Sequence, residues 1–145
     1  MKYLTFIRYA ESLRELDPPQ DLMVAVGEFI QQSLNRGVLL DSGGLMPIKD
    51  AVRVRLSAGR ITVTDGRFME TREVIGGWAI LETETETETE TETETETETE
   101  TETRAEAVRL TQEFMQFHRR FWPEFEGESE CRPMYAPPGD SSSQS

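Results

Sequence analysis

Residues 64–78 constrain the fold of this chain more than any other segment, because they place a turn between two strands. The segment is Thr-Asp-Gly-Arg-Phe-Met-Glu-Thr-Arg-Glu-Val-Ile-Gly-Gly-Trp. An alternating strand over 60–64 precedes the turn, and the apolar run 78–81 follows it. Asp65-Gly66 is therefore predicted to lead the chain out of a sheet, and Gly76-Gly77 to return it. Acidic and hydroxyl groups then lie on a turn between strands.

A Glu-Thr repeat from Glu82 to Thr103 supplies 11 of the 28 acidic residues. Without its 22 residues, 123 remain, which is the size of one domain with a single core. As a helix, the repeat would place Glu beside Glu at i,i+4 spacings, where like charges repel each other. As a single strand it would extend about 75 Å, whereas a domain of this size has a radius of gyration of about 14 Å. We expect the repeat to be a disordered insert. A tract that binds cations or a basic partner is the functional alternative.

Charge and composition limit the possible partners. Subtracting the repeat changes the net charge from −13 to −2, and Lys and Arg are dispersed, so no nucleic-acid partner is indicated. No apolar stretch approaches 18 residues and no signal-peptide pattern follows Met1, so a cytoplasmic protein without a membrane partner is expected. Cys131 is the only cysteine, and His118 is the only histidine. A single cysteine cannot form an internal disulfide, and one histidine with scattered carboxylates gives no metal-ligand spacing. No cofactor is predicted.

The first half of the chain is predicted as a strand, a helix and a group of strands. A strand over 1–9 precedes a helix over 18–36 that has Asp17 at its cap and Gly37 as its stop. A short buried strand is expected over 38–40, and the chain is expected to leave the sheet through 42–44. The hairpin of 51–57 and 60–64 alternates apolar and polar residues, which predicts one wet side. The buried face of the helix is expected to comprise Leu22, Val26, Phe29, Ile30 and Ser33.

The second half is predicted as a helix and a last strand. Thr103-Arg-Ala-Glu106 fits a capping box, so we expect the helix to begin there and to end at Pro123. Its buried face is expected to comprise Ala107, Leu110, Phe114, Phe117 and Phe121. Residues 128–134 form the last strand, and 136–145 form a disordered tail by composition. Residues 1–135 are thus one α+β domain, interrupted by the insert at 82–103, with a ferredoxin-like sheet covered on one face by two helices.

The turn segment resembles the DGPF branch of the YCII-related family. The matching residues are Asp65, Gly66, Phe68, Glu70 and Thr71, with Gly76 and Gly77 beyond them, while Arg67 replaces the family's proline. The resemblance runs through most of the chain and implies a dimeric α+β barrel, hence a homodimer. Relatives in the YciI-like branch are thought to use a His on the first helix with an Asp. The first helix here has no histidine, so that pair does not transfer.

Several polar side chains are candidates for a site. Asp65, at a strand end beside Phe68, is a candidate general base with a pKa raised toward neutrality; the alternative is a carboxylate that caps its own turn. Glu70 and Thr71 are candidate ligand contacts, or part of a solvated face. Asp41 is another carboxylate at the end of a strand, or the start of a turn. His118 lies on the flank of its helix's buried face, as a catalytic group or a hydrogen-bonded packing residue.

Two functions remain open from the sequence. One is a small-molecule-binding protein or acid–base enzyme with a pocket between the sheet and a partner subunit. Asp65, Glu70 and His118 would be its catalytic groups, and Asp41, Phe68 and Thr71 would contact the ligand. The other is a non-catalytic regulatory module. DGPF-type proteins are often encoded beside extracytoplasmic-function sigma factors, so the resemblance implies a sigma factor as a candidate partner.

Overall fold

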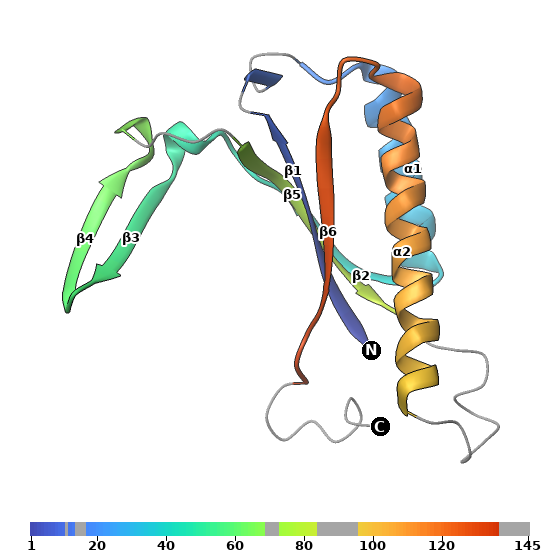
Figure 1. The fold of residues 1–145 in the computed structure, drawn as a ribbon. Helices are drawn as coiled ribbons and strands as arrows, with labels where there is room; N and C mark the ends of the chain where they lie inside the picture. Colours follow the sequence, from blue (N-terminus) through green and yellow to red (C-terminus); the bar gives the residue numbers. More distant parts are fainter. Residues whose placement is uncertain (11, 14–16, 69–72, 84–95, 137–145) are drawn as a thin grey trace.

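The chain forms a four-stranded antiparallel sheet with two helices on one face and a separate two-stranded hairpin on the other side (Figure 1). This computed structural model describes residues 1–10, 12–13, 17–68, 73–83 and 96–136. The predicted α+β class, with both helices on one face of the sheet, is confirmed. The segments 84–95 of the repeat and 137–145 of the tail lie outside the described residues, so the predicted disorder there stays a prediction.

The four-stranded sheet has the order β2-β5-β1-β6, and each neighbouring pair is antiparallel. Its strands are β1 (Lys2–Ala10), β2 (Leu39–Gly44), β5 (Glu73–Glu82) and β6 (Gly127–Pro133). The two crossovers, β1-α1-β2 and β5-α2-β6, each skip one strand of the sheet. This topology is compatible with a ferredoxin-like fold. The expected exit through residues 42–44 and the expected return through 76–77 are wrong, since both glycine pairs belong to strands.

Helix α1 (Gln20–Asn35) presents the predicted face to the sheet. Leu22 and Ser33 are buried on it. The helix begins later than predicted, after Pro19, and no side chain caps it, so the role expected for Asp17 is wrong. The stop is as expected: Gly37 follows the last turn at φ 75°, a left-handed conformation that favours glycine.

Helix α2 (Glu96–Phe121) begins inside the Glu-Thr repeat, so the capping box expected at Thr103 is wrong. Thr103 lies within the helix, is 1% exposed, and has its hydroxyl 3.4 Å from the Tyr3 hydroxyl. At the other end of the repeat, Thr83 is also buried and exchanges a backbone hydrogen bond with Met1. Both ends of the repeat are therefore parts of the fold. None of the described helices combines the length and the apolar character needed to cross a membrane.

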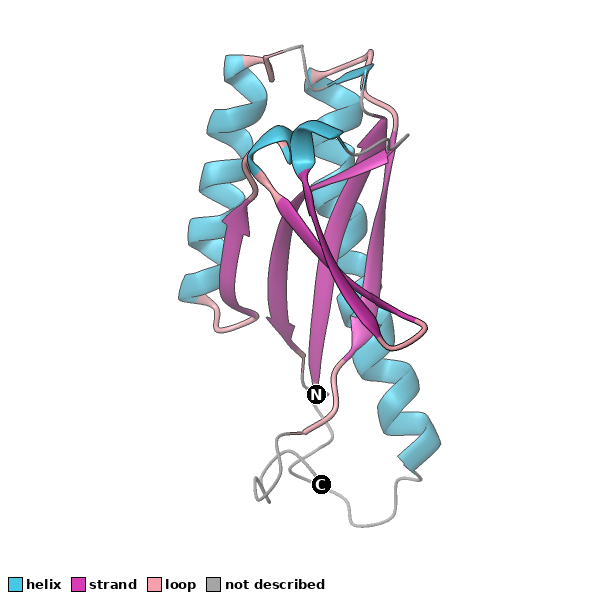
Figure 2. Cartoon of the chain, turned by 90° about the vertical axis from the view of Figure 1, so that its left-hand side faces the viewer, coloured by secondary structure: helices cyan, strands magenta, loops and turns pink. Residues whose placement is uncertain are grey.

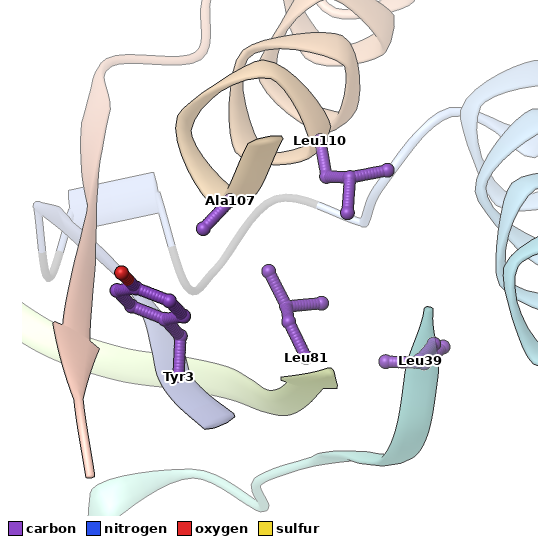
Figure 3. Packing of buried hydrophobic residues seen from close by; sticks show 5 residues of the cluster. All are labelled: Tyr3, Leu39, Leu81, Ala107 and Leu110. Carbon is purple, nitrogen blue, oxygen red and sulfur yellow. The ribbon is translucent and has the colours of Figure 1, made fainter. Parts of the chain in front are cut away.

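The core lies between the sheet and α2. Tyr3 and Leu81 are cross-strand partners in β1 and β5, and Leu39 of β2 is the partner of Leu81 on its other side. These three side chains face the helical layer, where Ala107 and Leu110 of α2 point toward them (Figure 3). Since strand side chains alternate between faces, the residues beside them in the sequence point to the uncovered face of the sheet.

The hairpin consists of β3 (Val52–Ser57) and β4 (Arg60–Asp65), joined by Ala58 at φ 52° and Gly59 at φ 75°. These left-handed residues form a turn whose twist suits a two-residue hairpin. Seen from the side opposite the helices, the hairpin crosses in front of the sheet (Figure 2). The prediction of one wet side is wrong for the single chain, because residues 52–63 are exposed on both faces.

Candidate functional site

A cavity of about 380 Å³ lies between the sheet and the two helices. Val26, Phe29 and Ile30 of α1 line it from one side, and Leu110 and Phe114 of α2 from the other. The floor contains residues with little or no side chain, which leave the space unfilled although large side chains surround it. These are Gly44 of β2 and Gly77 and Ala79 of β5, whereas the space beside Gly43 and Gly76 is occupied by the rings of Trp78 and Tyr9. The size falls within the range of small-molecule sites, about 300–1,000 Å³.

The polar groups of this cavity carry no formal charge at neutral pH. They comprise the hydroxyls of Thr5, Tyr9, Ser33, Ser42, Thr111 and Ser129, and the imidazole of His118. Among the described residues that line the cavity, none is Asp, Glu, Lys or Arg. Such a lining favours an uncharged and largely apolar ligand, because a charged one would lose its hydration without gaining an ionic partner.

His118 is the one imidazole of the cavity, and it is held in place on α2. Its side chain is 8% exposed and lies between the rings of Phe114 and Phe125, with centroid distances of 4.7 and 4.8 Å. Nδ1 lies 3.1 Å from the carbonyl oxygen of Phe114, which can only accept, so Nδ1 carries the proton. Nε2 is then a hydrogen-bond acceptor. Burial lowers the pKa of His118 below its ordinary value, although the bond to Phe114 opposes this.

This lowered pKa predicts that His118 makes stability depend on pH. Between the pKa values of the folded and unfolded chains, the unfolded chain binds more protons. The contribution is therefore complete above the unfolded pKa of about 6.5 and is lost as pH falls through the folded pKa. Urea unfolding from about pH 8 to about pH 5 should show a steeper loss for the wild type than for His118→Gln. Parallel curves for the two proteins would contradict a buried neutral imidazole.

Asp65 lies outside this cavity, at the base of the hairpin. Its carboxylate accepts hydrogen bonds from the backbone N–H of Arg67 at 3.0 Å and from the guanidinium Nε and Nη2 of Arg67 at 3.2 and 3.1 Å. These bonds lower the pKa of Asp65, which corrects the expectation of a raised value. Arg67 thus neutralises the neighbouring acid. Asp65 therefore has the geometry of a carboxylate that caps its own turn.

The other candidates do not gather around His118. Asp41 lies in β2 opposite Ile80, and its carboxylate accepts the backbone N–H of Ser42 at 2.8 Å. Phe68 is 76% exposed beyond the hairpin, in the short helix η3 (Gly66–Phe68). Neither residue lines the cavity. Glu70 and Thr71 lie outside the described residues, so their roles stay predictions.

Sequence reasoning missed the cavity because two of its signals were assigned to turns. Both glycine pairs lie in strands that hydrogen-bond side by side, with Gly44 opposite Gly77. Close approach is also required there, since a Cβ on Gly77 would lie 3.2 Å from the Gly43 carbonyl oxygen. Glycines at paired strand positions therefore indicate a close approach of the two backbones, here in the floor of the cavity.

Comparison with known families gives one match. The model of the YCII-related domain matches residues 1–113, from β1 into α2. The matched residues include α1 and the glycine-rich strands, whereas His118 and β6 follow the matched segment. No curated protein matches the chain.

Proposed function

We propose a function for this chain, which belongs to the YCII-related domain family: it binds a small uncharged molecule in the cavity between its sheet and its helices. The observation that carries this proposal is a 380 Å³ space whose described lining holds no charged side chain apart from His118, an imidazole whose pKa is lowered by burial. The ligand site is then on the helical side of the sheet, rather than at the subunit interface expected from the sequence. A ligand hydroxyl or N–H would donate to Nε2 of His118.

Binding is favoured over two-group acid–base catalysis. Such catalysis needs a second titratable group within hydrogen-bond reach of the substrate. The carboxylates of Asp41 and Asp65 do not line the cavity, and no other carboxylate is among the described residues that line it. His118 alone supplies a base, and its lowered pKa makes it a weak one. We therefore assign His118 to ligand orientation.

The protein is further proposed to be a homodimer that associates through the uncovered face of its sheet. This face carries Leu4 and Phe6 of β1 with their partners Ile80 and Trp78 of β5. All four are half-buried, and strand alternation places them on the face opposite to Tyr3 and Leu81. Apolar sheet faces are normally packed against another layer. Family resemblance to a dimeric α+β barrel supports the same arrangement.

A ligand screen tests the binding proposal. Unfolding temperatures would be measured against a set of small neutral metabolites, with charged analogues of the same size as matched controls. A ligand present at 100 times its Kd stabilises the folded state by about 2.7 kcal/mol. We expect stabilisation by neutral members and none by their charged analogues. Stabilisation by the charged analogues alone would contradict the proposed cavity site.

A further inference from the structure

The hairpin β3–β4, called the arm below, has one apolar face and one polar face. Cross-strand register places Val54 opposite Val63 and Leu56 opposite Ile61 on the same face, with Val52 beside them. The other face carries Arg53 opposite Thr64 and Arg55 opposite Thr62. This pattern is typical of a strand pair with one buried side.

In the single chain that apolar face is open to solvent. The exposed fractions of Val52, Val54, Leu56, Ile61 and Val63 lie between 63% and 71%. A two-stranded hairpin alone is only marginally stable in water, and a contiguous apolar patch on it marks a contact surface. The arm also leaves the sheet on the side opposite the helices and stands away from it (Figure 1). It therefore needs a covering surface that the described residues of its own chain do not supply.

The uncovered face of the sheet supplies a matching surface. Its apolar part comprises Leu4, Phe6, Trp78 and Ile80 on the two central strands. Its polar part lies toward β6, where the guanidinium of Arg8 pairs with Glu130 at 3.2 Å and with Glu128 at 3.6 Å. The apolar face of the arm carries one charged residue, Asp65 at its base opposite Val52, and its other members are apolar, so it suits the central strands and not the β6 side.

We propose that the arm is exchanged between two copies of this chain, so that each arm packs its apolar face on the uncovered sheet face of the other copy. The proposal rests on the homodimer proposed above. Both complementary surfaces belong to one chain, so a two-fold axis makes the contact twice. Each arm side chain offers on the order of 70 Å² of apolar surface. Counted for the five apolar side chains of both arms and for equal areas on both receiving faces, the buried area is on the order of 1,400 Å², within the range of stable interfaces.

Two matched substitutions on β4 test the exchange. Val63→Asp places a charge on the apolar face, whereas Thr62→Asp places the same charge on the adjacent polar face of the same strand. Both positions are exposed in the single chain, so neither change disturbs the core. Sedimentation equilibrium should show the dimer Kd of Val63→Asp raised about 30- to 100-fold, and that of Thr62→Asp within about threefold of wild type.

The results of these measurements distinguish the arm exchange from dimer formation and from ligand binding. A wild-type monomer at micromolar concentration would overturn both the dimer and the exchange. A wild-type dimer that Val63→Asp leaves intact would overturn the exchange alone. Ligand stabilisation that persists in Val63→Asp shows that the cavity works within one chain, and it leaves the arm result unaffected.

A cross-linking experiment identifies the surface that the arm contacts. A photoreactive benzoyl-phenylalanine replaces Val54, and chains labelled with ¹⁵N are mixed with unlabelled chains before irradiation. We expect mixed-isotope cross-links between the arm and peptides of β1 or β5. Cross-links within one isotope only, to the same chain, would show that the arm closes on its own sheet and would overturn the exchange.

Discussion

Val26→Phe is expected to abolish stabilisation by any ligand that the wild type binds in its cavity. Val26 lines the cavity from α1, so the larger ring occupies part of the 380 Å³. Affinity should fall at least 100-fold, because the ligand and the ring then compete for one space. The folded protein itself should lose no more than about 1–3 kcal/mol, the usual cost of overpacking, and less if the ring fills empty space. Calorimetric titration of both proteins with the same ligand gives the two affinities.

Val24→Phe is the matched control for this change. Val24 lies two residues earlier on the same helix and is 52% exposed. The substitution is chemically identical but points away from the cavity, so ligand affinity should stay within about twofold of wild type. Equal losses in the two variants would place the ligand elsewhere on the protein.

Leu81→Ala is expected to have the largest effect on stability. Leu81 is 6% exposed at the centre of the sheet, between its partners Tyr3 and Leu39, and it packs beneath α2. Removing a buried leucine costs about 2–5 kcal/mol, and the upper part of this range applies where the surroundings cannot collapse. Leu81 also lines the cavity, so the new void joins space that is already open. Urea unfolding at fixed protein concentration measures the loss.

Leu34→Ala makes the same chemical change on the surface of α1, where Leu34 is 41% exposed. Its cost should be below about 1 kcal/mol. Similar costs for the two variants would mean that the core does not lie between the sheet and α2. The protein concentration is held fixed because the free energy of unfolding of the proposed dimer depends on it.

Much of the fold follows from periodicity in the sequence. The 3.6-residue spacing of Leu22 and Ser33 identified the buried face of α1, and strand alternation identified both strands of the hairpin. These patterns are local and therefore visible in one chain. The start of α2 was not predictable in this way, because Glu-Glu repulsion at i,i+4 spacing argues against a helix. The helix nevertheless extends through Thr103, whose burial beside Tyr3 is a tertiary contact.

The candidate site was less predictable than the fold. Asp65 was correctly placed at a turn, but its environment depended on the direction in which the Arg67 side chain points. His118 was correctly placed on the flank of the core. Its neighbour Phe125 lies beyond the helix end, so its contact with His118 is not encoded in helical spacing. The cavity arises between elements, and no single element specifies its volume.

Methyl-resolved NMR with the most stabilising neutral compound would show where on the protein that compound binds. Probes on Val26, Ile30 and Leu110 surround the cavity, whereas Val54, Leu56 and Val63 report on the arm. We predict saturable shifts at the cavity methyl groups, with the ¹⁵N resonance of His118 Nε2 changing as it accepts a hydrogen bond from the ligand. Shifts confined to the arm methyl groups, with the cavity methyl groups and His118 unchanged, would contradict the cavity as the binding site.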